Sequence, residues 1–403
     1  MGDNILIVHG GGPTSVINAS LYGAVKEAKK YKEIDHIYAA RNGTGGLMRE
    51  ELIELEKVPD EKLELLLNTP GSAIGTSRDQ IEQAEYDRMI EVLLKKNIKY
   101  VLFNGGNGSM DTCGKLYKNC QARGLDIRVM GIPKTHDNDI AITDHSPGYG
   151  SIARYMAQSV KEVAADVKGL PIHVVVVEAL GRNAGWTTAA SALADDGDGV
   201  GPDLIYLPEV PFDTDDFLLD VKRMLFERNN VIIAVSEGIR DASGNYISAS
   251  EKSVDTFGHS QLSGAGKTLE FLVKEKLGVK VRSIEVNVLQ RCAAHLASKT
   301  DLMESVELGK KAVALSEEGV TASMVIMNRV SDDPYTIEYG YAEIKNIANE
   351  ARSVPAEWIN AAGNDVTQEF IDYLTPLIQG ESNVTYENGL PVYMDVSHLT
   401  KHQ

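Results

Sequence analysis

The stretch Asn4–Ser20, NILIVHGGGPTSVINAS, decides the fold class of this chain. Its first part, Asn4–His9, predicts a buried strand; three glycines end that strand, and Val16–Lys29 predicts a helix. A short apolar run, glycines and a helical pattern follow one another again from Tyr100–Phe103 onward. This alternation is typical of βαβ units that build a parallel sheet.

Further strands are expected along the rest of the chain. The strongest signal is His173–Glu178, HVVVVE, whose unbroken valines predict a parallel strand covered on both faces. Ile127–Ile132, Leu204–Leu207 and Val231–Val235 are similar but shorter. We therefore expect an α/β protein with two Rossmann-like three-layer domains and mainly parallel sheets.

Domain boundaries are inferred from the grouping of the strands, since the sequence has no obvious linker. The first domain is expected to comprise residues 1–150, rejoined by about 291–345. The second is expected to comprise residues 151–290 together with the C-terminal segment 346–403.

Composition excludes some classes of partner. The 403 residues include 58 acidic and 40 basic side chains, a formal net charge of -18, which argues against binding to nucleic acid or an anionic membrane. The three cysteines cannot all pair, and the N-terminus lacks the basic flank and long apolar stretch of a signal peptide. We expect a cytoplasmic protein that acts on small molecules.

Three polar or glycine-rich loops follow predicted strands: Gly10–Thr14, Gly105–Ser109 and Pro133–Asp139. The carboxyl ends of parallel strands commonly carry the ligand site, and glycines let backbone amides approach a phosphate closely. Either glycine loop could also be a plain structural turn. Neither has the spacing of a Walker A motif or of a dinucleotide-binding fingerprint, which counts against a nucleotide-binding oxidoreductase.

The third loop is the most specific of the three. Asp137 and Asp139 flank Asn138, and Lys134 and Thr135 come just before them. A carboxylate can accept a hydroxyl proton while cations neutralise a phosphoryl group in transfer. The loop therefore indicates a phosphoryl-transfer centre, with a solvated acidic turn as the alternative.

Seven motifs occur in a characteristic order. They are GGGPTSVINAS (Gly10–Ser20), GSAIGTSR (Gly71–Arg78), NGGNGS (Asn104–Ser109), GIPKTHDND (Gly131–Asp139), VEALGRNAGW (Val177–Trp186), SEG (Ser236–Gly238) and LQR (Leu289–Arg291). With these motifs the chain resembles the phosphofructokinase family. The later stretch RSVPAEWINAAGNDVTQEFIDYLTPLI (Arg352–Ile378) resembles the branch that includes pyrophosphate-using enzymes.

The resemblance implies transfer of a phosphoryl group to the 1-hydroxyl of fructose 6-phosphate, with Mg²⁺ as cofactor. By position, Asp137 would be the general base, Thr135 would lie near the transferring phosphoryl group, and Lys134 would face the leaving phosphate. Arg182 would meet the developing negative charge, because a guanidinium matches phosphate oxygens. For a single arginine the alternative is a surface ion pair.

The resemblance also implies an active site in the cleft between the two domains, with the phosphoryl donor bound by the first domain and the sugar phosphate by the second. It further implies binding residues. On the sugar side these would be Asp139, Gly181, Glu237, Val288, Arg291 and, from a neighbouring subunit, Arg282. On the donor side they would be Gly11, Arg78, Gly106, Gly108 and Ser109, with Asn107 at the metal. A role for Arg282 across an interface implies a homodimer or homotetramer.

Two positions give opposite indications about the donor. Gly108 stands where pyrophosphate users of the family carry an aspartate that would exclude the α-phosphate of ATP, so Gly108 indicates ATP. Lys134 stands where common bacterial ATP enzymes have glycine, so it indicates pyrophosphate. We expect ATP, because an aspartate excludes ATP outright whereas a lysine can serve either donor; a reversible pyrophosphate-dependent enzyme is the alternative.

Departures from the family pattern keep other hypotheses open. Asn107, His173 and Val288 replace an aspartate, a cation and a histidine or tyrosine, and His136 replaces an apolar residue. They leave open another sugar phosphate, such as sedoheptulose 7-phosphate. They also leave open a catalytically weak regulatory subunit that binds sugar phosphates.

Overall fold

The computed structural model describes residues 2–195, 197, 199–247, 264–347, 351–396 and 399. The chain divides into two compact units. Unit 1 comprises Met1–Ser151, Arg291–Ala351 and Gln379–Gln403, and unit 2 comprises Ile152–Gln290 and Arg352–Ile378.

The C-terminal segment differs from the expected boundaries. Only Arg352–Ile378 groups with unit 2, whereas the whole segment 346–403 was expected there. The chain beyond residue 378 belongs to unit 1 because Met394 and Val396 are buried in that unit's core. The Met394 N–H also donates to Thr69 Oγ1 at 2.9 Å.

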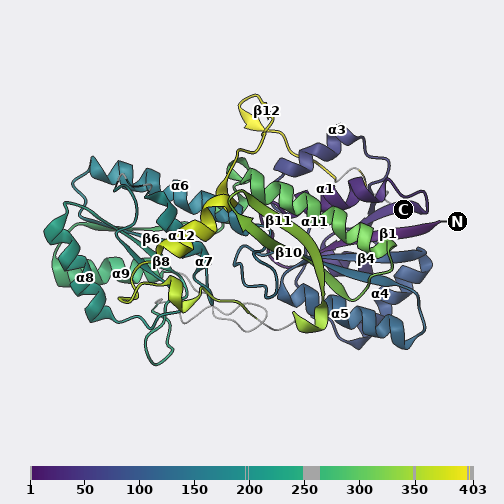
Figure 1. Cartoon of the computed structure of the whole chain (residues 1–403), viewed down its shortest axis with the longest axis horizontal. Helices are drawn as coiled ribbons and strands as arrows, with labels where there is room; N and C mark the ends of the chain where they lie inside the picture. Colours follow the sequence, from purple (N-terminus) through teal and green to yellow (C-terminus); the bar gives the residue numbers. More distant parts are fainter. Residues whose placement is uncertain are drawn as a thin grey trace. The chain divides into compact units, whose positions relative to one another are not determined.

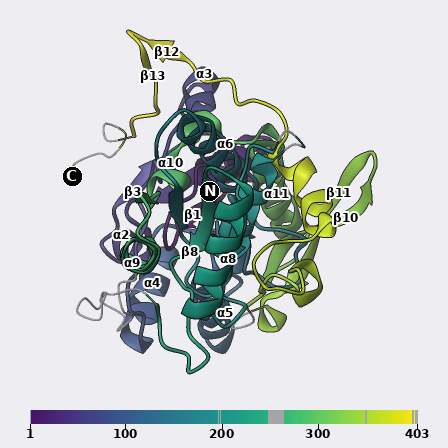
Figure 2. The ribbon, with the colours of Figure 1, turned by 90° about the vertical axis from the view of Figure 1, so that its left-hand side faces the viewer.

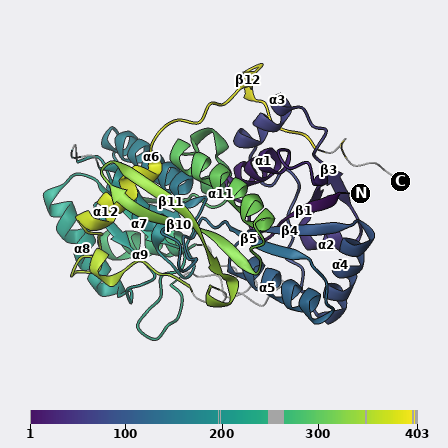
Figure 3. The same ribbon diagram turned by 45° about the vertical axis from the view of Figure 1, so that its right-hand side comes forward.

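Unit 1 is built on a mixed sheet. Within the described residues its strand order is β11-β10-β5-β4-β1-β2-β3. Neighbouring strands from β2 to β10 are parallel, and the edge strands β3 and β11 are antiparallel to their neighbours. The strands are β1 (Asp3–His9), β2 (Ile34–Ala40), β3 (Leu52–Glu54), β4 (Ile98–Gly105), β5 (Arg128–Pro133), β10 (Ser323–Asp332) and β11 (Tyr335–Glu343); Figure 3 shows the long β10–β11 pair.

Helices cover both faces of this sheet. The side chains of β1 alternate, so Ile5 and Ile7 pack in the core with α1 and α11, while Leu6 and Val8 pack with α4 and α5 (Figure 1). The α-helices of unit 1 are α1 (Ile17–Ala28), α2 (Gly43–Met48), α3 (Asp60–Leu63), α4 (Gln83–Lys95), α5 (Asn107–Ala122) and α11 (Lys299–Glu317). Shorter elements are η1 (Glu64–Asn68), α10 (Leu289–Cys292), η3 (Ala294–Leu296), η4 (Ile344–Asn346) and the hairpin β12–β13 (Tyr386–Glu387, Leu390–Pro391; Figure 2).

Unit 2 has a parallel sheet of order β7-β8-β6-β9. Val174 and Val176 of β6 pack with α8 and α9, whereas Val175 and Val177 pack with α6 (Figure 1). The predicted two-sided burial is confirmed for these valines, but His173 is exposed and precedes the strand. The strands are β6 (Val174–Ala179), β7 (Leu204–Tyr206), β8 (Val231–Ser236) and β9 (Val281–Glu285). The helices are α6 (Tyr149–Lys168), α7 (Trp186–Ala189), η2 (Ala190–Ala194), α8 (Thr214–Glu227), α9 (Ala265–Leu277), η5 (Ala356–Trp358), α12 (Gln368–Leu374) and η6 (Thr375–Ile378).

The predicted α/β class with mainly parallel sheets is confirmed in both units. In the part of the chain that the structure describes, no helix is both long enough and apolar enough to cross a bilayer.

Candidate active site

The three predicted loops lie at one edge of the sheet in unit 1. β1, β4 and β5 are parallel neighbours, and the loops follow their carboxyl ends. Backbone hydrogen bonds connect them: Gly10 N donates to Asn104 O, and Lys134 N donates to Gly105 O, each at 3.0 Å. The topology therefore brings together segments that are far apart in the sequence.

Close packing explains two of the glycines. A β-carbon built at Gly10 would lie 2.2 Å from Ser109 Oγ, and one built at Gly105 would lie 2.1 Å from the same atom. Gly106 immediately precedes α5. Gly108 differs, because a β-carbon there would meet no atom within 4 Å. A side chain at position 108 would therefore occupy open space.

Lys134 is the buried cation of the site. It is 3% exposed, and its Nζ donates to Gly12 O at 2.5 Å. Burial lowers the pKa of Lys134 to about 8, and the nearby guanidinium groups of Arg291 and Arg78 add to that effect. Asp137 and Asp139 oppose it. The ammonium group is thus held next to the first glycine loop and remains mostly charged at pH 7.

Two arginines lie beside the same loop. A β-carbon built at Gly12 would lie 3.0 Å from Arg291 Nη1 and 3.5 Å from Arg78 Nη2. The segment that carries Arg78 is fixed to the loop, since Gly11 N donates to Ser77 O at 3.1 Å and Thr76 Oγ1 donates to Gly11 O at 2.8 Å. Arg291, expected at the sugar, therefore lies here next to a residue expected at the donor. Its role at the sugar 6-phosphate stays a prediction.

Sequence reasoning missed the supporting role of Thr76 and also that of His9. His9 is fully buried at the end of β1, and its Nδ1 lies 2.7 Å from Ser72 Oγ. Ser72 Oγ donates to Gly75 O at 2.8 Å, so His9 Nδ1 must be the donor of the first bond. Burial, with the charge of Lys134 adding to it, lowers the pKa of His9 to about 3, so the ring is neutral. The sequence signal that could have revealed this role is a histidine placed directly before a glycine loop.

The loop with the two aspartates is ordered by its own hydrogen bonds. Asp137 N donates to Thr135 Oγ1 at 3.1 Å. Burial raises the pKa of Asp139 to about 6, and the charge of Asp137 adds to this. His136 Nε2 lies 3.4 Å from Asp137 Oδ1, and burial lowers the pKa of His136. The Asp137 side chain is 38% exposed, so a substrate hydroxyl can reach it. The turn is thus partly buried and not fully solvated, and its role in phosphoryl transfer stays a prediction.

Asn107 and Asp139 offer oxygens of the type that a magnesium ion binds. Among the described residues, Asn107 Oδ1 is a buried oxygen without a hydrogen-bond partner. Asn107 Nδ2 lies 3.4 Å from Asp139 Oδ2. Mg²⁺ prefers carboxylate and amide oxygens, and its charge would favour the ionised form of Asp139.

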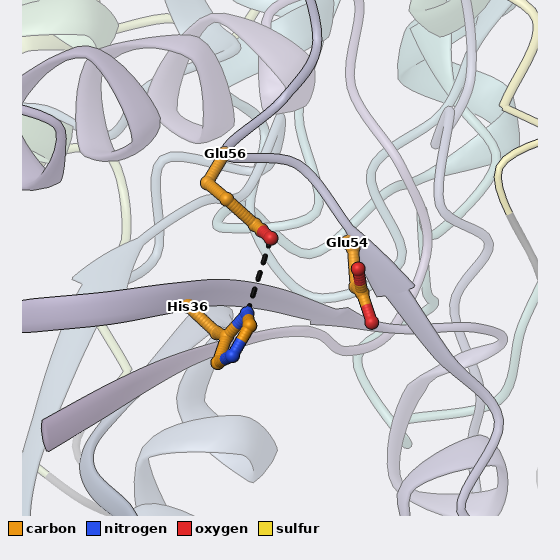
Figure 4. A group of neighbouring side chains, drawn as sticks. All are labelled: His36, Glu54 and Glu56. Carbon is orange, nitrogen blue, oxygen red and sulfur yellow. Dashed lines mark hydrogen bonds and ion pairs between the residues drawn. The ribbon is translucent and has the colours of Figure 1, made fainter. Parts of the chain in front are cut away.

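Another cluster with metal-binding residue types lies outside these loops. His36, Glu54 and Glu56 form the one such group that the described residues contain (Figure 4). His36 Nδ1 lies 3.1 Å from Glu56 Oε1, and Lys57 Nζ lies 3.6 Å from Glu54 and 3.8 Å from Glu56. The carboxylates are already paired, so this cluster is not the predicted magnesium site.

Two of the residues expected on the sugar side, Gly181 and Glu237, come together in unit 2, next to Arg182. Gly181 N donates to Glu237 Oε1 at 3.4 Å, at the carboxyl ends of the paired strands β6 and β8. Gly181 has φ 146°, which only glycine adopts readily. A β-carbon at Gly238 would lie 2.1 Å from Arg182 O, so the SEG motif packs directly against Arg182.

Arg282 and Val288 lie elsewhere in unit 2. Arg282 is exposed on the edge strand β9 and lines a pocket with Glu162 and Asp166 of α6. Val288 is 48% exposed.

The comparisons with known proteins agree with this arrangement. The family model described as Phosphofructokinase matches residues 4–316. The chain belongs to the phosphofructokinase family. It is therefore a phosphofructokinase-type phosphotransferase, and the predicted resemblance is confirmed.

Relatives of this phosphofructokinase are named for pyrophosphate. The pyrophosphate–fructose 6-phosphate 1-phosphotransferase of Halomonas elongata is 38% identical, over 99% of this chain and 97% of that protein. The protein of the same name from Xanthomonas campestris is 39% identical, over 98% and 96%. The pyrophosphate-dependent phosphofructokinase structure from Nitrosospira multiformis has a TM-score of 0.92 at 34% identity, covering 100% of this chain and 98% of that one. These names do not support the expected preference for ATP.

Proposed function

We propose that this phosphofructokinase transfers a phosphoryl group from pyrophosphate to the 1-hydroxyl of fructose 6-phosphate, reversibly and with Mg²⁺. The observation that carries the proposal is the position of Lys134, buried at the Gly12 carbonyl with Arg78 and Arg291 alongside. Three cations beside one glycine loop suit a compact donor made only of phosphate groups. The full-length similarity to proteins named for pyrophosphate supports the same donor.

The chain's own residues supply the steps of the transfer. Asp137 accepts the proton of the 1-hydroxyl as that oxygen forms a bond to phosphorus. The bond from phosphorus to the bridging oxygen breaks, and Lys134 faces the phosphate that leaves. Thr135 hydrogen-bonds near the group in transfer. Mg²⁺, when bound at Asn107 and Asp139, would neutralise phosphate charge.

The proposed sugar-binding residues are in unit 2 and at Arg291. Arg182 balances the negative charge that develops on the phosphoryl group, and Gly181 and Glu237 hold the sugar. We propose that Arg282 reaches the sugar phosphate of a neighbouring subunit in a homodimer or homotetramer. Its exposure on an edge strand is compatible with that role.

Initial rates with the two donors test the proposal. Fructose 1,6-bisphosphate formation is measured from fructose 6-phosphate and magnesium, with pyrophosphate and ATP in parallel. We expect pyrophosphate to give a kcat/KM at least about 100-fold higher than ATP, a difference of about 2.7 kcal/mol. Equal or faster turnover with ATP would contradict the donor assignment. An Asp137→Ala variant that retained wild-type turnover would contradict the mechanism.

ATP is the second candidate donor, and one observation favours it. A β-carbon at Gly108 would meet no atom within 4 Å, so the wild-type residue presents no side chain to the α-phosphate of a nucleotide placed there. A Gly108→Asp variant tests this point. If the wild type uses ATP, the carboxylate should abolish that activity by charge repulsion and leave pyrophosphate turnover in place.

A further inference from the structure

A buried cluster of charged side chains lies next to the loop Pro133–Asp139, called the catalytic loop below. None of these side chains takes part in the chemistry proposed above. His145, at its centre, has 1% of its side chain exposed. Its Nδ1 lies 2.7 Å from Asp144 Oδ2, and its Nε2 lies 2.7 Å from Glu304 Oε2. A ring that contacts a carboxylate through each nitrogen donates from both, which requires the imidazolium form. Burial lowers the pKa of His145, but the two carboxylates outweigh burial and raise it to about 9.

Neighbouring elements hold both carboxylates in place. Arg329 Nη2 of β10 lies 3.0 Å from Asp144 Oδ2, and Tyr335 OH of β11 donates to Glu304 Oε1 at 2.6 Å. One turn before Glu304 on α11, Asp301 accepts hydrogen bonds from Gly148 N and Ser151 N, each at 2.9 Å. Asp144 and Glu304 face His145 directly. The charged and titratable groups that act on these two carboxylates are Arg329, Tyr335, Asp301 and Tyr339.

The segment that carries His145 is hydrogen-bonded to the catalytic loop. Ser146 N donates to Asn138 Oδ1 at 2.9 Å, and Thr135 N donates to Pro147 O at 3.2 Å. Asn138 is fully buried and has φ 51°, a left-handed conformation that an asparagine keeps only where its surroundings support it. The backbone of residues 143–148 thus supports the turn between the two aspartates.

We propose that His145 is a positioning residue for phosphoryl transfer. By joining Asp144 to Glu304, it holds residues 143–148 against α11 and so fixes the turn that presents Asp137. The inference rests on the proposed function in taking Asp137 as the general base. The alternative is an ion-pair cluster that stabilises unit 1 and has no effect on the reaction.

Kinetics of a His145→Gln variant test the inference. Glutamine can still donate to one carboxylate, but it carries no charge and cannot bridge both. We expect kcat to fall about tenfold or more, with KM for both substrates changed by less than about twofold, because a small displacement of the base slows the chemical step. Amide hydrogen exchange of Thr135 should also accelerate, since its N–H is bonded to Pro147.

Tyr335→Phe is the matched control. It removes the other hydrogen bond to Glu304 and leaves residues 143–148 untouched. We expect a lower unfolding temperature with unchanged kcat and unchanged exchange at Thr135. If Tyr335→Phe lowered kcat as much as His145→Gln, loss of stability alone would explain both variants and the inference would fail.

A second variant and a wild-type measurement complete the test. If His145→Gln does not fold, the double variant His145→Gln/Glu304→Gln removes the unpaired carboxylate, and wild-type kcat and exchange in that variant would overturn the inference. Wild-type turnover is measured first, with both donors. A wrong donor or a wrong reaction therefore appears in the wild type, whereas the exchange at Thr135 reports on His145 independently of turnover.

Discussion

Lys134 and Gly108 give opposite indications about the phosphoryl donor, and their surroundings differ in kind. Lys134 is enclosed, bonded to a backbone carbonyl and electrostatically coupled to two arginines. Gly108 is exposed and faces open space. A buried cation acts directly on a phosphate, because little water screens it. The open position at Gly108 leaves room for the larger donor ATP, but it supplies no group that would bind ATP. The position of Lys134 is therefore the stronger argument.

Loss of the Lys134 proton should lower kcat/KM for pyrophosphate at high pH. Because burial lowers its pKa to about 8, the ammonium is charged below that pH and loses its proton above it. We expect kcat/KM for pyrophosphate to fall as the pH rises through about 8, as kcat/KM reports ionisations of the free enzyme. A Lys134→Arg variant stays charged and should lose this decline. An unchanged profile in that variant would assign the ionisation to another group.

Alanine substitutions of Arg291 and Arg78 should affect different KM values. Both guanidinium groups lie beside Gly12, but the family resemblance also assigns Arg291 to the sugar 6-phosphate. We expect Arg78→Ala to raise KM for pyrophosphate alone, and Arg291→Ala to raise KM for both substrates, each by about tenfold or more. Steady-state kinetics with each substrate varied in turn measures the two effects. A pyrophosphate KM unchanged in Arg291→Ala would restrict this arginine to the sugar.

At the scale of elements, the glycine loops are shaped by the first turn of α5. Gly10 and Gly105 both approach Ser109, so the loops after β1 and β4 pack against the same hydroxyl. The sequence left open whether these loops are structural turns or phosphate-binding loops. The packing shows that one loop can have both roles. Close packing requires the glycines, and the same packing places the backbone amides at the edge of the sheet.

Paired substitutions test this packing. A β-carbon at Gly10 would be 2.2 Å from Ser109 Oγ but 3.3 Å from Ser109 Cβ, whereas one at Gly105 would be 2.4 Å from Ser109 Cβ. We expect Gly10→Ala and Gly105→Ala each to cost about 1–3 kcal/mol of unfolding free energy. Adding Ser109→Ala should restore most of the loss at Gly10 but not at Gly105. Urea unfolding measures this difference, and equal rescue at both positions would contradict the geometry.

At the scale of the whole molecule, the chain leaves unit 1 after Ser151, returns at Arg291, and contributes its last segment to unit 1 again. Every residue expected at the donor lies in unit 1. The residues Gly181, Arg182 and Glu237 lie in unit 2. Each unit is built from segments that are separated in the sequence. A fragment made of one contiguous half of the chain would therefore lack part of the core that supports either group of residues.

The last segment should be needed for the stability of unit 1. Met394 is 7% exposed and packs in the core of that unit, whereas the adjacent Tyr393 is 44% exposed. We expect Met394→Ala to lower the unfolding free energy by about 2–3 kcal/mol through the lost contacts and the cavity. Tyr393→Ala should change it by less than about 1 kcal/mol. Similar urea midpoints for the two variants would show that this segment does not contribute to the core.

Local residue patterns alone predicted the α/β class and the buried strands, and both are confirmed. The phosphoryl-transfer role of the loop around Asp137 stays a prediction. Apolar runs, glycines and acidic pairs are local signals that need no knowledge of distant contacts. The tertiary structure decided the burial of Lys134, the proximity of Arg291 to Arg78, and the return of Met394 to unit 1. It also joined His145 to Glu304, 159 positions away in the chain. Burial and pairing at such separations depend on which strands and helices become neighbours, and local residue patterns do not contain that information.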